Sequence, residues 1–132
     1  MTTDEELLFV YGTLKRGLSN HHWLGEAQYV AEAQTQNDFA LYTIEYPFLS
    51  KEPALYPVHG ELYRLSWDEL THVDVLEQHP DDYCRELIDV VLDNGQVLRA
   101  WAYFHPNPSG VLLADGYFDE HGLANGQPVQ AQ

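Results

Sequence analysis

The order of apolar and polar residues along the chain predicts a fold made mainly of short strands. Residues 7–11 form a continuous apolar run that ends at Gly12, a pattern typical of a buried strand. Residues 59–65 alternate between polar and apolar side chains, which indicates a strand with one buried face. Residues 28–42 have a moderate content of β-branched and aromatic side chains, and we expect two further strands there.

A β-hairpin is predicted in the second half of the chain. Residues 83–92 and 97–104 have the composition of strands, and the sequence Asp93-Asn94-Gly95 lies between them. Asn-Gly pairs favour the positive φ angles that tight hairpin turns require. The hairpin implies antiparallel pairing of its two strands.

Prolines and glycines mark the segments in which regular structure is not expected. Residues 46–57 contain three prolines and are predicted to form an irregular loop with rigid corners. Residues 105–110 contain two more prolines and interrupt the strand pattern. Residues 122–132 are polar and contain Gly and Pro, so we expect a flexible tail there.

One helix is predicted with defined ends. Ser66 and Glu69 match a capping box, in which each side chain bonds the backbone N–H of the other residue. The helix is expected to run to about Gln78, because Pro80 disfavours helical geometry in the residue before it. A short helical turn is also expected over residues 21–24.

These elements together predict an α+β fold. Strands dominate, and the sheet that they form is expected to be mixed and to curl around a pocket. Closure of that sheet into a barrel does not follow from the residue pattern alone. The length of 132 residues fits a single domain spanning residues 1–132, with an ordered core over residues 7–118. A chain of this length buries roughly two thirds of its unfolded surface.

The charge balance excludes several classes of partner. The chain carries 21 acidic and six basic residues, for a formal net charge of −15. Such a surface repels phosphate backbones and anionic lipid, so neither nucleic acid nor membrane is expected as a partner. A carboxylate ligand must therefore be held locally, by backbone N–H groups or by one of the few cations.

Other features of the composition favour a cytoplasmic protein, which we expect to be a monomer. No apolar run approaches the ~20 residues of a membrane-spanning helix. The acidic N-terminal residues lack the basic region of a secretory signal. Cys84 is the single cysteine, so no internal disulfide can form, which suits a reducing compartment.

The position of Glu77 on the predicted helix makes it a candidate acid–base residue. Glu77 follows Leu70 by seven positions and Val73 by four, which places all three on the apolar face. Desolvation of a carboxylate there raises its pKa toward neutrality, where it can both accept and return a proton. Alternatively, the side chain reaches solvent from the helix end, or pairs with Arg85 or Arg64.

The loop after the first strand is a candidate binding element. A chain that leaves a buried strand exposes backbone N–H groups, and Gly12 lets it turn without a side-chain clash. Such N–H groups can hold a carboxylate or a developing oxyanion. The alternative is an ordinary strand-to-loop turn. The sequence is not a phosphate-binding Walker loop, because the required spacing and the Gly-Lys-Ser/Thr ending are missing.

Four segments of the chain carry motifs in a fixed order. They are Val10-Tyr11-Gly12-Thr13-Leu14-Lys15-Arg16-Gly17 with Asn20-His21, then His59-Gly60-Glu61-Leu62-Tyr63, then Val73-Asp74-Val75-Leu76-Glu77 with Pro80, Tyr83 and Arg85, and last Asp115-Gly116-Tyr117-Phe118. Together they resemble the motifs of the γ-glutamylcyclotransferase-like family, and in particular those of its γ-glutamylamine cyclotransferase branch. The resemblance covers most of the chain.

The resemblance implies a fold and a set of site residues. The fold is a compact mixed β-barrel with flanking helices and a cavity at one end. Glu77 matches the catalytic glutamate of the family. The residues that match its γ-glutamyl-binding loop are Tyr11, Gly12, Thr13 and Leu14. Tyr83 and Tyr117 are further candidates for substrate contact, although a core role is favoured for each, and Arg85 is a candidate cation for a substrate carboxylate.

The implied reaction is an intramolecular cyclisation of a small γ-glutamyl substrate. The α-amine of the substrate attacks its own γ-carbonyl, which forms 5-oxoproline and releases an amine, with Glu77 as the general acid and base. The nucleophile belongs to the substrate, so we expect an enzyme of transferase or lyase type that needs no cofactor and no metal. Two alternatives remain: a non-catalytic module that binds a small ligand, and a cyclotransferase that removes a γ-glutamyl cap in a biosynthetic pathway.

Other side chains are weaker candidates for chemistry. A lone cysteine such as Cys84 is commonly a small buried hydrophobe rather than a nucleophile. The seven histidines match no metal-ligand spacing, and His21 is expected to order the loop instead. Asp74 lies about 60° from Glu77 around the helix and is a candidate helper, although its position favours a solvated or capping role.

Overall fold

Eight short strands, one α-helix and one 3-10 helix make up the part of the chain that the structure describes. The computed structural model describes residues 5–12, 14–16, 21–43, 47–51, 54–77, 79, 83–105, 111–113 and 116. The elements are, in chain order, β1 (Glu5–Val10), η1 (His21–Leu24), β2 (Gln28–Thr35), β3 (Ala40–Thr43), β4 (Pro47–Ser50), β5 (His59–Ser66), α1 (Trp67–Glu77), β6 (Cys84–Leu92), β7 (Val97–Phe104) and β8 (Val111–Leu112).

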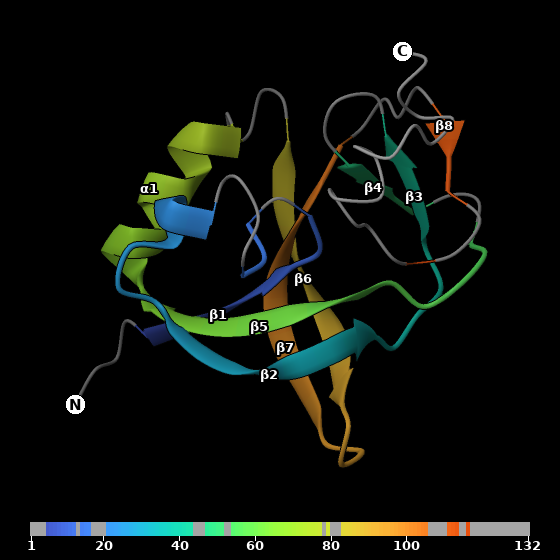
Figure 1. Cartoon of the computed structure of the whole chain (residues 1–132), viewed down its shortest axis with the longest axis horizontal. Helices are drawn as coiled ribbons and strands as arrows, with labels where there is room; N and C mark the ends of the chain where they lie inside the picture. The colour runs from blue at the N-terminus through green and yellow to red at the C-terminus, as the bar shows by residue number, and fades with distance from the viewer. Residues whose placement is uncertain are drawn as a thin grey trace.

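Five of the strands close into a barrel in the order β1-β5-β2-β6-β7, which occupies the centre of Figure 1. Neighbouring strands pair in antiparallel fashion except β1 and β7, which run parallel and meet at Leu8 and Trp101. This parallel contact turns the curled mixed sheet into a closed barrel. The α+β class and the barrel that the family resemblance implies are both confirmed.

A separate three-stranded sheet, in the order β4-β3-β8, lies on the other side of the barrel from α1 (Figure 1). The prediction of an irregular loop over residues 46–57 was wrong in part, because β4 lies within that range. Pro47 is the first residue of β4, and β4 is an edge strand that pairs with β3 alone. Proline is tolerated at the first residue of an edge strand, where no ladder N–H is needed.

Both predicted helical segments are confirmed. Ser66 N–H donates to Glu69 Oε1 at 2.8 Å, and Glu69 N–H donates to Ser66 Oγ at 3.1 Å, which completes the capping box. The helix ends at Glu77, and Gln78 lies outside the described residues. The short turn over residues 21–24 is the 3-10 helix η1.

The predicted hairpin is formed by β6 and β7. Gly95 has a φ of 88°, a left-handed conformation that glycine adopts without steric strain. The N–H of Gly95 donates to the Leu92 carbonyl at 2.9 Å, and the N–H of Leu92 donates to the Gln96 carbonyl at 2.9 Å. The turn residues at 93–95 therefore act as the sequence predicts.

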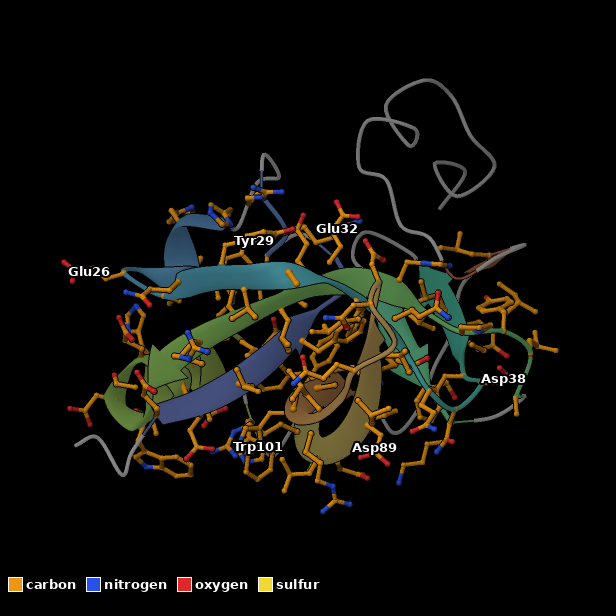
Figure 2. The ribbon with its side chains drawn as sticks, turned by 90° about the horizontal axis from the view of Figure 1, so that it is seen from below. Glu26, Tyr29, Glu32, Asp38, Asp89 and Trp101 are labelled. Carbon is orange, nitrogen blue, oxygen red and sulfur yellow. The ribbon has the colours of Figure 1, made fainter. Side chains whose placement is uncertain are left out.

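Alternate residues of β1 contribute to two apolar clusters. Phe9 packs inside the barrel with Leu62 and Val90. Leu8 and Val10 face the other way and pack in a second cluster that includes the apolar face of α1. In the view of Figure 2, Tyr29 and Glu32 lie on one side of the barrel and Trp101 and Asp89 on the opposite side.

The register between β1 and β5 determines where the end of α1 lies. Glu5 pairs with Ser66, so α1 starts beside the beginning of β1. The helix has 11 residues and rises about 16 Å, close to the length of about 20 Å that the six residues of β1 span. Since α1 packs back along β1, its last residue, Glu77, comes to the end of β1 where Tyr11 begins the loop.

Candidate active site

The loop that leaves β1 begins with a buried tyrosine. Tyr11 is only 6% exposed, and its hydroxyl donates to the backbone carbonyl of Tyr103 at 2.7 Å. Gly12 and Leu14 are also buried, and the carbonyl of Gly12 accepts a hydrogen bond from the N–H of Lys15 at 3.0 Å. Thr13, the fourth residue of the predicted binding loop, lies outside the described residues.

Side chains of β5 and η1 fasten the far end of this loop. The N–H of Arg16 donates to Glu61 Oε1 at 2.8 Å, and the same oxygen accepts a hydrogen bond from the Tyr63 hydroxyl at 3.1 Å. His21 Nδ1 donates to the Leu14 carbonyl at 2.9 Å, which requires the tautomer with its proton on Nδ1. His21 therefore orders the loop, as the sequence analysis expects.

Gly60 allows β5 to pass directly beneath the start of the loop. A Cβ atom at Gly60 would lie 2.2 Å from the carbonyl oxygen of Val10 and 2.8 Å from the ring of Phe9. No side chain fits at these distances, so steric crowding explains why the second motif has glycine at position 60. Its absent side chain lets the chain turn from Val10 into Tyr11 close to the barrel wall.

Glu77 is close enough to the buried phenol of Tyr11 for the two groups to interact electrostatically. Leu70 and Val73 are fully buried on the inner face of α1, and Glu77 is half-buried at the edge of that face. Burial raises the pKa of the Tyr11 hydroxyl well above its ordinary value, and electrostatic interactions with Tyr83 and Glu77 raise it further. The structure thus brings together the loop tyrosine and the candidate catalytic carboxylate.

Tyr103 is a second phenol near Glu77. Burial raises its pKa above the ordinary range, as do its hydrogen bond to Asp74 and the charges of Asp74 and Glu77. Tyr103 is 3% exposed. Both phenols therefore stay protonated at physiological pH, and neither adds a negative charge to the region around Glu77.

Tyr83 lies in the same region, after the end of α1. Its N–H donates to the Glu77 carbonyl at 3.1 Å, and its ring packs edge-on against His105 with centroids 5.1 Å apart. Tyr83 is 8% exposed, and its electrostatic interaction with Tyr11 contributes to the raised pKa of the Tyr11 hydroxyl. The placement puts this candidate within the cluster that surrounds Glu77 and Tyr11.

Arg85 has a protein partner. Its guanidinium makes two hydrogen bonds to the carboxylate of Asp74, at 2.8 Å and 3.0 Å, and the two side chains are 8% and 13% exposed. Binding a substrate carboxylate with the same edge would require breaking this buried pair. The geometry therefore favours a structural role for Arg85 over the substrate-binding role proposed from the sequence.

The fourth motif is described only at Gly116. The carbonyl of Gly116 accepts a hydrogen bond from the N–H of His59 at 2.7 Å. A Cβ atom at Gly116 would lie 2.0 Å from the carbonyl oxygen of Pro57, so only glycine fits against this segment. Tyr117, a candidate for substrate contact, lies outside the described residues.

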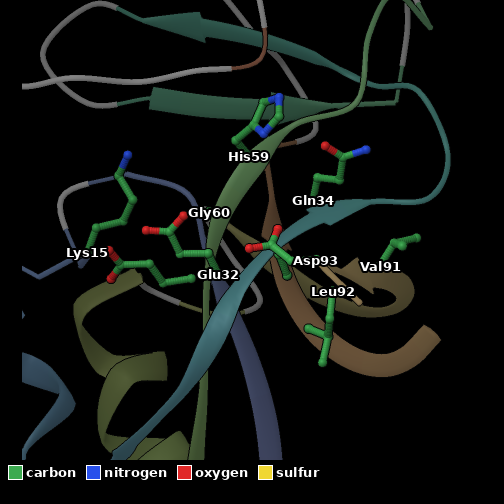
Figure 3. A pocket seen from close by; sticks show the side chains of 10 residues that line it. Lys15, Glu32, Gln34, His59, Gly60, Val91, Leu92 and Asp93 are labelled. Carbon is green, nitrogen blue, oxygen red and sulfur yellow. The ribbon is translucent and has the colours of Figure 1, made fainter. Parts of the chain in front are cut away.

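A pocket of about 290 Å³ lies among the loop, β2, β5 and the end of β6. Figure 3 shows Lys15 and Glu32 on one side of this pocket and Gln34 and Val91 on the other. Its lining consists of Lys15, Glu32, Ala33, Gln34, His59, Gly60, Glu61, Val91, Leu92 and Asp93. Neither Glu77 nor Tyr11 is among these described residues, so a cavity shared by both stays a prediction.

Comparison with known proteins settles which family the fold and the motifs represent. The sequence profile of the family described as gamma-glutamyl cyclotransferase, AIG2-like, matches residues 8–120. The chain belongs to this family. The resemblance seen in the four sequence motifs is thereby confirmed.

Relatives and a solved structure agree with this assignment to the gamma-glutamyl cyclotransferase family. A protein of Methanocaldococcus jannaschii, provisionally named a gamma-glutamylcyclotransferase, is 32% identical over 117 residues, which are 88% of this chain and 98% of that protein. Gamma-glutamylaminecyclotransferase A of Danio rerio is 34% identical over 107 residues, which are 73% of this chain and 66% of that protein. The crystal structure of an AIG2-like protein from Mus musculus has a TM-score of 0.78 at 27% identity, over 90% of this chain and 93% of that chain.

The histidines that the structure describes do not gather at a common centre. His72 stacks on Trp23 at 5.0 Å, and His79 Nδ1 accepts the N–H of Arg85 at 3.2 Å. Cys84 is a half-buried free thiol at the start of β6. Within the described part of the chain, no three His, Cys, Asp or Glu residues group as metal ligands, and no helix there is long and apolar enough to span a membrane.

Tyr103 is the residue of this region that sequence reasoning missed. It lies on the face of β7 that is turned toward α1, among apolar neighbours, so its local pattern indicates only a core residue. Its two roles, a carbonyl that binds Tyr11 and a hydroxyl that binds Asp74, join segments far apart in the chain. No local sequence signal reveals such contacts. Asp74 was a candidate helper, and the structure makes it the partner of Arg85 and Tyr103.

Proposed function

We propose that the protein is a γ-glutamyl cyclotransferase that releases 5-oxoproline and a free amine from a γ-glutamyl amine or γ-glutamyl amino acid. Glu77 is the general acid and base in this proposal, and the Tyr11–Leu14 turn binds the γ-glutamyl group. The observation that carries the proposal is the electrostatic interaction of Glu77 with the buried Tyr11 phenol. Membership of the gamma-glutamyl cyclotransferase family supports it.

The proposed reaction balances with the substrate and one carboxylate. The α-amine nitrogen forms a bond to the γ-carbonyl carbon, and the bond from that carbon to the leaving nitrogen breaks. The α-ammonium nitrogen loses two protons on the way to the lactam: Glu77 accepts one and returns it to the leaving nitrogen, and the other passes to solvent or to the released amine. Intramolecular reactions of well-oriented groups reach effective molarities of about 10⁵–10⁸ M. Proton transfer by a positioned side chain adds roughly 10²–10⁴-fold.

The loop geometry suggests which part of it holds the substrate. The N–H groups of Lys15 and Arg16 already bond to Gly12 and Glu61. We therefore assign the γ-glutamyl group to the preceding turn, where backbone dipoles can bind a carboxylate or the developing oxyanion. This suits a chain of net charge −15, because the attraction comes from local dipoles.

The protonated phenols also suit a catalytic carboxylate at this place. Since the pKa values of Tyr11 and Tyr103 are raised, both side chains stay neutral while Glu77 exchanges protons. Neutral hydroxyl groups do not repel the ionised carboxylate, and the proposed reaction requires that carboxylate to transfer protons in both directions.

The test of the proposed function is the release of 5-oxoproline by the purified chain. γ-Glutamyl amines, γ-glutamyl amino acids and glutathione are incubated with and without protein, in the presence and absence of a chelator. We expect 5-oxoproline above the uncatalysed rate with at least one class, and no effect of the chelator. If calorimetry detects binding of a γ-glutamyl compound but no 5-oxoproline forms, the protein is a non-catalytic binding module and the proposal is contradicted.

A further inference from the structure

A cluster of three buried side chains joins the last turns of α1 to the barrel wall. Arg85 donates from Nε to Oδ1 of Asp74 at 2.8 Å and from Nη2 to Oδ2 at 3.0 Å. The hydroxyl of Tyr103 donates to the same Oδ1 at 2.5 Å. The three residues belong to α1, β6 and β7, so one carboxylate links the helix to two strands of the barrel.

This cluster is adjacent to the groups of the proposed site. Asp74 precedes Glu77 by three positions, which places the two side chains about 60° apart around the helix. The backbone carbonyl of Tyr103 accepts the hydrogen bond of the Tyr11 hydroxyl at 2.7 Å. Tyr103 therefore contacts both the helix that carries Glu77 and the tyrosine of the substrate loop.

Further contacts hold the Arg85 side chain and the end of the helix in place. The guanidinium lies 5.0 Å from the ring centroid of Trp67 and 4.5 Å from that of Trp101. The N–H of Arg85 donates to His79 Nδ1 at 3.2 Å, and the N–H of His79 donates to the Asp74 carbonyl at 3.0 Å. The helix end and the start of β6 are thus bound to each other through side chain and backbone.

The protonation states make these hydrogen bonds strong. Burial by itself raises the pKa of Asp74, but the hydrogen bonds from Arg85 and Tyr103 and the charge of Arg85 outweigh it, and the net pKa is lowered. At neutral pH an ionised carboxylate therefore accepts from a guanidinium and a phenol. Charge-assisted hydrogen bonds of this kind are shorter and about twice as strong as neutral ones.

We infer that Asp74 and Tyr103 are positioning residues for the proposed reaction, which set the Glu77 carboxylate against the Tyr11 loop while Arg85 holds Asp74 in place. The inference rests on the proposed function. Proton transfer needs hydrogen-bond reach to the substrate amine, and a misplacement of about 1 Å can lower a rate by about 100-fold. A helix end released from the barrel would leave substrate binding by the loop intact and slow the proton transfer.

Tyr103→Phe tests the inference most cleanly. The substitution removes the hydroxyl that binds Asp74 and keeps the backbone carbonyl that binds Tyr11. We expect kcat for 5-oxoproline release to fall about tenfold with KM changed less than about twofold, because positioning rather than binding is lost. Asp74→Asn should act in the same direction. The double variant should be no slower than the slower single variant, since both residues act as one unit.

Tyr56→Phe is the matched control. The Tyr56 hydroxyl accepts from the N–H of Leu41 at 3.0 Å and donates to the Leu113 carbonyl at 2.8 Å. Leu41 lies in the three-stranded sheet β4-β3-β8, and Leu113 follows its last strand. This variant should lose stability to a similar degree and keep wild-type kcat. If Tyr103→Phe lowers the unfolding midpoint but retains wild-type kcat, the cluster is structural only and the inference is overturned. Additive effects of the two site variants would equally contradict a shared unit.

A second measurement separates this inference from the proposed function. The amide of Tyr83 donates to the Glu77 carbonyl at 3.1 Å and so reports the order of the helix end. Its hydrogen exchange should be faster in Tyr103→Phe than in the wild type or Tyr56→Phe. Unchanged exchange would overturn the inference whatever the activity. A wild type that releases no 5-oxoproline while exchange responds as expected would instead refute the proposed function alone.

Discussion

Two buried phenols, those of Tyr11 and Tyr103, interact electrostatically with the Glu77 carboxylate in a protein of high negative charge. The contribution of each residue here depends on close contact. Gly60 makes room for the turn into the loop, Tyr103 binds both Tyr11 and Asp74, and Asp74 binds Arg85. At the residue scale the site is therefore a set of contacts between elements far apart in sequence.

Gly60→Ala is expected to disturb the start of the loop. The added Cβ would meet the Val10 carbonyl oxygen at 2.2 Å, and this backbone atom cannot move aside without shifting the turn. Overpacking of this kind typically lowers the free energy of unfolding by about 1–3 kcal/mol. Urea unfolding measures the loss. Gly95→Asn is the comparison, because nothing lies within 4 Å of its Cβ position and Asn tolerates positive φ. Equal stabilities of Gly60→Ala and wild type would contradict the assigned steric role.

Asp74→Asn should change the pH dependence of stability. The folded-state pKa of Asp74 lies below its ordinary value, so its ionisation stabilises the fold above the unfolded pKa of about 3.9. This contribution is lost as the pH falls through the folded pKa. The wild type should therefore exceed Asp74→Asn in free energy of unfolding by a constant amount at neutral pH and by progressively less below about pH 4. If the difference in free energy of unfolding between the two proteins grows as the pH falls, the pKa of Asp74 is raised rather than lowered in the folded state, which would contradict the prediction.

At the scale of helices, strands and turns, the sequence predicts the elements that their own residues mark with a clear pattern, and it does not predict the others. The apolar run of β1, the capping box of α1 and the Asn-Gly turn between β6 and β7 are each encoded by neighbouring residues. Strand β4 was missed because its first residue is a proline, which is compatible with an edge strand but gives no strand signal. Strand β8 is too short for its pattern to be recognised.

The capping box provides the test at this scale. Ser66→Ala removes the side chain that accepts the N–H of Glu69, and loss of such a cap lowers the free energy of unfolding by about 1 kcal/mol. Glu69→Gln is the matched control, because glutamine can still accept the N–H of Ser66. Thermal or urea unfolding should rank Ser66→Ala below Glu69→Gln. The reverse order would contradict the observed cap.

At the scale of the whole molecule, the barrel closes through contacts that no local pattern encodes. The parallel pairing of β1 with β7 joins Leu8 to Trp101 across most of the chain. Only the family resemblance implied this closure, and the structure confirms it. The same holds for the candidate site: the sequence placed Glu77 on the inner face of α1, but its proximity to Tyr11 depends on the register of β1 and β5.

The net charge of −15 predicts how salt affects the whole molecule. Apart from Arg85–Asp74, the ion pairs of the described residues have at least one partner that is largely exposed, and such pairs contribute little to stability. Repulsion among the excess carboxylates should therefore dominate, and salt screens it as the Debye length falls from about 30 Å at 0.01 M to about 10 Å at 0.1 M. The thermal midpoint should rise with added sodium chloride. A falling midpoint would mean that attractive pairs outweigh the repulsion.

Glu77→Gln tests the central claim most directly. The substitution keeps the size of the side chain and removes the group that accepts and returns the proton, so kcat for 5-oxoproline release should fall by at least about 100-fold. The unfolding midpoint and the affinity for the γ-glutamyl substrate should change little. Glu86→Gln is the control, because Glu86 pairs with Lys51 at the surface and should leave kcat unchanged. A Glu77→Gln protein that turns over γ-glutamyl compounds at a rate near that of the wild type would contradict the account.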